Sequence, residues 1–214
     1  MTRRVLFFVL ISAAARAEII DRVAVTLDNR VITQSDILRQ IRLAAFLEDK
    51  PPETNAAAHR AAAQRLVDRA LMDREMQVSR FPLPSPQDAD ALFAQVRQGH
   101  FSNDAAFRQA LLRYRIQERE LRAFLLAQLT MLRFIDFRFR PSVQVQEAEI
   151  LDYYQKRFLP RSRAQGVAPD PTLESARDAI EKILTDETVD RVLDSWMKDA
   201  RARTRIVYHE KAFQ

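Results

Sequence analysis

The sequence has 214 residues, two glycines and no cysteine; 47% of the residues are hydrophobic and 29% are charged. Without cysteine, a disulfide framework, a thiolate metal site and a cysteine nucleophile are excluded. Gly99 and Gly166 lie too far apart to form a phosphate-binding glycine loop. The length suits one large domain or two small ones, and the abundant Ala, Leu, Arg, Glu and Gln favour a mostly helical globular fold.

Residues 1–17 have the pattern of a secretory signal peptide. A positively charged start precedes an uncharged stretch over residues 5–15, and a small-x-small motif predicts cleavage between Ala17 and Glu18. The uncharged stretch is shorter than the roughly 20 residues that span a bilayer. An uncleaved anchor and a buried N-terminal helix are the alternatives.

Cleavage at this site would remove three arginines and lower the formal charge from +5 to +2. A charge of +2 does not support a nucleic acid as partner, although the intact sequence is basic. The most apolar later run, residues 123–139, is interrupted by Arg133, Asp136 and Arg138. We therefore expect a packed helix there and no stable membrane insertion after cleavage.

The mature chain is expected to begin with a hairpin and to end with a strand. Residues 22–33 alternate as two strands do, with a turn at Asp28-Asn29. The run at residues 204–209 is a candidate third strand beside this hairpin, which would bring the two ends into one domain. Caps, prolines and Gly99 delimit about seven helices between them. These are expected near residues 33–50, 55–80, 86–99, 103–114, 117–139, 147–157 and 172–203.

Residues 159–171, with three prolines and Gly166, have the composition of a linker.

Several segments in this order resemble SurA-type periplasmic chaperones and related foldases that contain a parvulin domain. The helix start NRVITQSD at residues 29–36 fits the family pattern N-x-x-I-T-x-S-[DE]. The segment at residues 143–154 fits V-x-V-x-x-x-E-I-x-x-Y-Y. The paired helices at 107–111 and 118–122, and the C-terminal helix from Ala176 onward, are also similar. The resemblance covers nearly all of residues 18–209.

The resemblance implies a mostly α fold: a multi-helix chaperone domain built from residues 18–158 and 172–209, with a small antiparallel sheet formed by the N-terminal hairpin and the C-terminal strand. It also implies a periplasmic, ATP-independent holdase without cofactor, whose partners are unfolded envelope proteins such as outer-membrane β-barrel precursors. Two departures stand out. Arg115-Ile116-Gln117 replaces a family glycine and Leu-Thr. Residues 159–171 are far shorter than the about 50 residues of a small domain, so the parvulin domain would be absent.

The polar residues show no catalytic pattern. His59, His100 and His209 are scattered, whereas zinc needs three or four converging ligands, so no metal site is expected. Acidic residues such as Glu147 and Glu149 suit a helix start and a solvated face. Sequence order does not test for a Ser-His-Asp triad, because triads assemble in space, but there is no nucleophile elbow. We expect no catalytic residues.

Aromatic residues near helix ends are the candidate client-binding residues. At these positions an apolar groove between helices could expose them to an extended chain. Core packing is the alternative, and helical spacing favours it for any single phenylalanine. The candidates are Phe46, Phe81, Phe93, Phe101 and Tyr114.

Three functions are compared on these grounds. The first is a periplasmic holdase with an apolar cleft between helices. The second is a structural or assembly subunit of an envelope complex, which keeps this fold and binds one dedicated partner. The third and weakest is a prolyl isomerase. The chain would be a monomer or a dimer that exchanges its C-terminal helix and strand.

Overall fold

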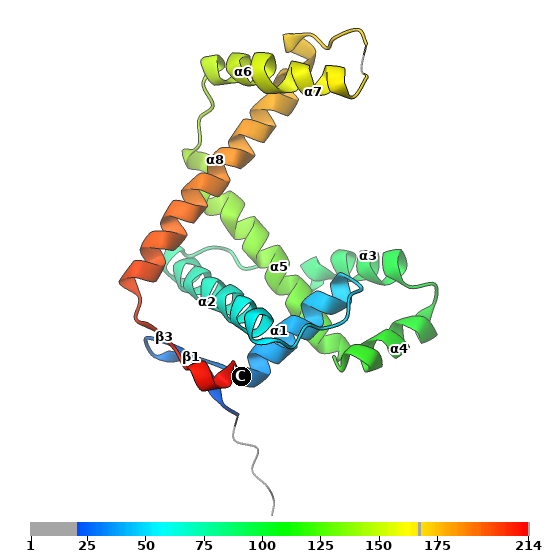
Figure 1. Cartoon of the computed structure of the whole chain (residues 1–214), viewed down its shortest axis with the longest axis vertical. Coiled ribbons are helices and arrows are strands. Elements are labelled where there is room, and N and C mark those ends of the chain that lie inside the picture. Colours follow the sequence, from blue (N-terminus) through cyan, green and yellow to red (C-terminus); the bar gives the residue numbers. More distant parts are fainter. Residues whose placement is uncertain (1–20, 167, 214) are drawn as a thin grey trace, which may run out of the picture.

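A computed structural model describes residues 21–166 and 168–213 of the chain. These residues form a mostly helical fold with a small antiparallel sheet, as the sequence predicts (Figure 1). The expected signal peptide, residues 1–17, and its cleavage site between Ala17 and Glu18 lie outside the described residues.

The sheet joins the two ends of the described chain. Strands β1 (Val23–Leu27) and β2 (Arg30–Thr33) form the expected hairpin, and Asp28 adopts a positive φ of 45° in its turn. Strand β3 (Ile206–Tyr208) pairs antiparallel with β1, which gives the strand order β2-β1-β3. The predicted third strand is therefore confirmed. A two-stranded hairpin alone is only marginally stable, and β3 supplies the additional strand that it needs.

Eight α-helices lie between the hairpin and β3 in the described chain. Short 3₁₀ helices at Pro86–Ala89, Arg140–Ser142 and Glu210–Ala212 and a π-helical turn at Tyr154–Phe158 accompany them. The helices are α1 (Gln34–Leu47), α2 (Ala56–Ser79), α3 (Asp90–His100), α4 (Asp104–Tyr114), α5 (Glu118–Phe139), α6 (Glu147–Tyr153), α7 (Leu159–Ala164) and α8 (Leu173–Arg203).

Local side chains begin and end these helices. Thr33, Asn55, Asn103 and Thr172 each accept a hydrogen bond from the backbone N–H three residues later. Helix α4 ends at Arg115, which takes the left-handed conformation (φ 53°) although it is not glycine. The corner that lacks the family glycine therefore keeps the usual geometry of a helix end.

The prediction that residues 159–171 form a linker is wrong for the first half of this segment. Residues 159–164 form α7, in which Ser162 is buried. Pro160 follows the π-helical turn directly, so this turn lies where proline lacks the N–H of a regular helix. The π-helical turn before it carries the chain from α6 into α7. Among the described residues of this segment, only 165–166 and 168–171 are irregular.

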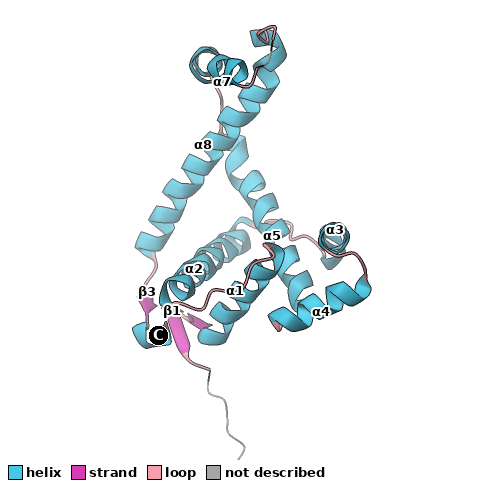
Figure 2. Cartoon of the chain, turned by 45° about the vertical axis from the view of Figure 1, so that its right-hand side comes forward, coloured by secondary structure: helices cyan, strands magenta, loops and turns pink. Residues whose placement is uncertain are grey.

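Helix α8 runs along the molecule from α6 and α7 at one end to the sheet at the other (Figures 1 and 2). Helix α5 meets α8 near the C-terminus of α5, where Arg140 pairs with Asp186 at 2.9 Å. The two helices diverge toward the sheet, and α2 contacts both of them.

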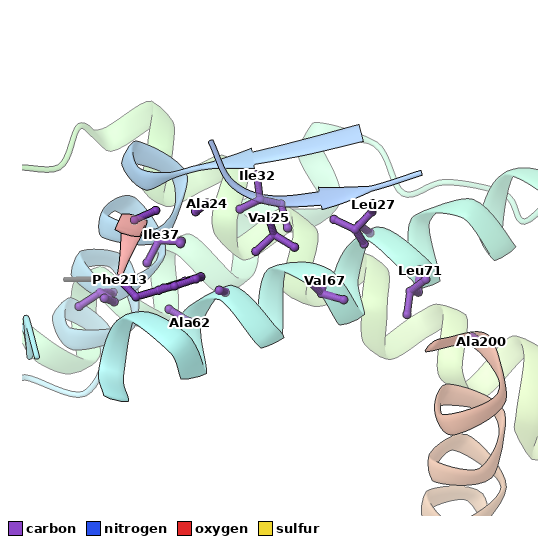
Figure 3. Close-up of a cluster of buried hydrophobic side chains, with 14 residues drawn as sticks. Ala24, Val25, Leu27, Ile32, Ile37, Ala62, Val67, Leu71, Ala200 and Phe213 are labelled. Atoms are coloured by element: carbon purple, nitrogen blue, oxygen red, sulfur yellow. The ribbon is translucent and has the colours of Figure 1, made fainter. Parts of the chain in front are cut away.

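Four clusters of buried side chains hold the fold. In the sheet cluster, β1 and β2 pack on α2 with Phe213 from the C-terminus (Figure 3). The ring cluster joins α1, α3, α4 and α5 around Phe46. The middle cluster joins α2, α5 and α8 around Phe134. The tip cluster, around Ile180, joins α6, the π-helical turn and the start of α8.

Candidate functional site

Two adjacent cavities lie beside α2, and together we call them the α2 groove. The first, of about 600 Å³, is bounded by β2, α1, α2 and α5. The second, of about 270 Å³, lies between α2, α5 and α8. Both are lined by Gln40, Leu66, Arg69 and Phe124, so they are adjacent. Together they extend from the sheet to the C-terminal half of α8.

The part of the groove nearest α8 is apolar and contains two methionines. The methionines, Ile135 and Leu193 are half-buried and also pack against the middle cluster, whereas Phe124 is buried in the ring cluster. Methionine is unbranched and polarizable, so it adapts to partners of different shape. The apolar lining from α5 and α8 comprises Phe124, Ala127, Met131, Ile135, Leu193 and Met197.

Each acidic residue of the groove is engaged by a basic side chain. Arg39 bonds both Asp36 and Glu120 at 3.1 Å, and these two carboxylates also cap α1 and α5. Arg30 lies 3.6 Å from Asp73. In the second cavity Arg201 pairs with Asp68.

Three arginines of the groove have no such partner. Among the described residues, Arg65, Arg69 and Arg119 form no ion pair, whereas the four carboxylates nearby are all paired. Arg65 and Arg119 are exposed and Arg69 is half-buried. Because Arg39 serves two carboxylates, the lining holds five arginines against four carboxylates, an excess of one positive charge.

The aromatic residues predicted to bind clients lie in the core. Phe46, Phe93 and Tyr114 are 3–5% exposed in the ring cluster, and Phe81 is 9% exposed in the middle cluster. Phe101 is half-buried and stacks on Phe46 at 5.5 Å between ring centroids. Four of the five rings are thus buried against rings from neighbouring helices, which contradicts their expected exposure. Phe101 is half-buried and lines a cavity of about 700 Å³ beside α3, so client binding there stays a prediction.

The groove residues carry a weaker sequence signal than the aromatics. Ala123, Ala127, Met131 and Ile135 recur every four residues on α5, beside the stripe that its core contacts need. A second apolar stripe on one helix indicates a second apolar face. Whether that face is packed or open depends on the angle between α5 and α8, which a one-dimensional pattern does not contain.

The three histidines are not brought together. His59 is buried in α2, His100 is exposed at the end of α3, and His209 Nε2 lies 3.0 Å from Thr26 Oγ1. Over residues 21–166 and 168–213, no group of three potential metal ligands occurs. In the same part of the chain, no helix combines the length and the apolar composition needed to cross a bilayer.

Comparison with known proteins assigns no family to the chain. No protein-family model matches it, and no curated protein matches it at a significant level.

Proposed function

We propose that the protein is a periplasmic, ATP-independent chaperone that holds unfolded envelope proteins in the α2 groove. The observation that supports this most is a groove beside residues 65–73 of α2, apolar in its part nearest α8 and bordered by three arginines that form no ion pair among the described residues. Unfolded chains offer apolar side chains that a folded protein buries, and such a groove can cover a few of them at a time.

The proposed binding is weak at each site and general in sequence. A client loses conformational entropy when a segment is held, so only the surplus of apolar burial over that loss remains as affinity. Met131 and Met197 suit such a role because their side chains can take several rotamers against different client residues. Outer-membrane β-barrel precursors, which the family resemblance implies, are the proposed clients.

The test is suppression of aggregation by the chain from Glu18 onward. At equimolar ratio it should suppress light scattering of an outer-membrane protein diluted from urea. Met131→Glu places a charge in the groove and should reduce the suppression strongly, because a client would have to bury that charge. Leu132→Glu is the matched control, since Leu132 is 64% exposed on the same helix and does not line either cavity.

Full suppression by M131E, with circular dichroism showing both variants folded, would contradict the groove as the client site. Failure of the unaltered chain to suppress aggregation would contradict the proposed function.

Two related functions are separated from this one by further measurements. A structural subunit of an envelope complex should pull down one stoichiometric partner from an envelope extract, whereas a chaperone should pull down many clients in small amounts. The proposal also expects no acceleration of prolyl cis–trans exchange in a peptide assay, because a parvulin domain has no room between α7 and α8.

A further inference from the structure

One wall of the α2 groove is the edge of the sheet. In the strand order β2-β1-β3, β2 pairs with β1 on one side only. Arg30, Val31 and Ile32 of β2 line the first cavity. An edge strand presents backbone N–H and C=O groups that an extended chain can pair with.

The hydrogen bonds of β1 indicate which residue of β2 faces outward. Asp28 N–H donates to the Arg205 carbonyl at 3.0 Å, and His209 N–H donates to the Ala24 carbonyl at 2.9 Å. The backbone N–H and C=O groups of the even-numbered residues in and beside β1 thus point toward β3. Thr26, which lies between Ala24 and Asp28, belongs to this set. Since backbone groups alternate along a strand, Thr26 does not bond its partner Val31 in β2. The N–H and C=O of Val31 therefore point away from β1.

Val31 is the natural point of attachment on this edge. Its side chain is 56% exposed, and its two outward backbone groups lie where β2 borders the first cavity. The next residue that could pair, Thr33, already gives its N–H to the Asp36 carboxylate at 3.0 Å. The edge thus offers one pair of main-chain bonds, which sets the register of an extended chain without holding it alone.

The charge of the groove selects among extended chains. Arg69 and Arg119 line the first cavity and Arg65 the second, and none has an ion-pair partner among the described residues. An acidic side chain in the groove would complement them, whereas a basic one would add to an existing excess. The apolar lining favours apolar residues at the alternate positions of such a strand.

We infer that the α2 groove takes an extended polypeptide in which apolar and acidic residues alternate, and that this chain adds as a short strand at Val31 of β2. The inference rests on the proposed function, because it names the class of client segment that the groove prefers. The main-chain bonds at Val31 set the register, the apolar side chains contact the lining, and the carboxylates pair with Arg69 and Arg119.

The experiment compares two fluorescent ten-residue peptides by anisotropy, using the chain from Glu18 onward. They share valine and leucine at alternate positions and carry glutamate or lysine at the others. We expect the glutamate peptide to bind about tenfold more tightly at low salt, with a smaller difference at 0.5 M salt, because exposed ion pairs are screened. Equal affinities, or tighter binding of the lysine peptide, would overturn the inference.

Two kinds of variant separate the charges from the strand. Arg69→Glu together with Arg119→Glu should remove the preference for glutamate, while Arg108→Glu, on the exposed face of α4, should keep it. A series of glutamate peptides, each N-methylated at one residue, tests the main-chain bonds. One position should lose about fivefold or more in affinity, since the methyl group removes the donor to the Val31 carbonyl. A flat series would overturn the strand addition.

Comparing peptide binding with the aggregation assay distinguishes failure of this inference from failure of the proposed holdase function. If the chain suppresses aggregation but binds both peptides equally, the proposed function stands and the acidic preference fails. If the chain binds the glutamate peptide selectively but does not suppress aggregation, the groove binds peptides as inferred and the holdase function fails.

Discussion

Phe46 shows how a single residue of α1 is held by rings from α4 and from the end of α3. Its ring centroid lies 5.5 Å from those of Phe101 and Tyr114 and 6.3 Å from that of Phe107. Phe101 stacks on Phe46 and the other two rings meet it edge to face, and both arrangements add to the free energy of burial. A residue held in this way stabilises the fold and is not available to a client.

Phe46→Ala should therefore lower stability and leave client binding intact in the folded fraction. The expected loss in free energy of unfolding is about 3–5 kcal/mol, because a cavity replaces a buried ring. Phe137→Ala is the control, since Phe137 is 49% exposed and should lose much less. Urea unfolding followed by circular dichroism measures both, and equal losses would contradict the assignment of Phe46 to the core.

Asp88 titrates outside its ordinary range. The Ser85 hydroxyl donates to this carboxylate at 2.6 Å and Arg133 at 2.8 Å, and these bonds lower the pKa of Asp88 from 3.8 to about 2. A carboxyl whose pKa is lower in the folded state stabilises the fold above pH 3.8, and this contribution is lost as the pH falls through about 2.

The stability gap between the unaltered chain and Asp88→Asn should close with acid. We expect the unaltered chain to be more stable at pH 5 and the two to converge near pH 2, as measured by urea unfolding at a series of pH values. Asp178→Asn is the control, because Asp178 is exposed and forms no ion pair in the described chain. A gap that stays constant with pH would contradict the low pKa of Asp88.

At the scale of the element, α1 depends on the residue before it. Thr33 Oγ1 accepts from Asp36 N–H at 3.3 Å, and the Asp36 carboxylate accepts from Thr33 N–H at 3.0 Å. The same threonine ends β2, so one residue joins the sheet to the helix that borders the α2 groove.

Thr33→Ala should cost about 1 kcal/mol of stability, because it leaves a backbone N–H of the first turn without its acceptor. Thr188→Ala is the matched control within α8, where alanine is the better helix former and no cap is lost. Thermal unfolding of both variants tests the difference. A loss in T188A as large as in T33A would contradict the role of the cap.

The elements that could be predicted are those defined by neighbouring residues. Thr33, Asn55, Asn103 and Thr172 are local signals, and the structure begins helices directly after them. Helix α7 was missed because Pro160 indicates a break unless the turn before it is known. The α2 groove could not be predicted, because strand β2 and four helices contribute to it and the angles between those elements are not encoded in local spacing.

At the scale of the molecule, the single helix α8 contributes buried side chains to three of the four clusters. Its start gives Ala176 and Ile180 to the tip cluster, its middle gives Val189 to the middle cluster, and its end gives Ala200 to the sheet cluster. The tip cluster has three buried residues, whereas the sheet cluster has fourteen. The tip lobe, comprising α6, the π-helical turn, α7 and the start of α8, should therefore open more readily than the rest.

Exposed polar contacts add little to the small apolar core of the tip lobe. Arg177 donates two hydrogen bonds to Glu147 at 2.6 Å, and Tyr154 donates to the Pro171 carbonyl at 2.7 Å. Both members of the Arg177–Glu147 pair are solvent-accessible, so the pair contributes little to stability. Ile180, which is fully buried, is the residue on which the lobe depends most.

Ile180→Ala should unfold the tip lobe while the α2 groove keeps its structure. The expected cost of about 2–5 kcal/mol is large for a lobe with a core this small, whereas Val189 and Ala200 still hold the rest of α8 against the body. Hydrogen exchange should show fast amides in α6 and unchanged protection in α2. Leu71→Ala in the sheet cluster should lower protection across α2 instead, and equal losses in α2 for both variants would mean that tip and body unfold as one unit.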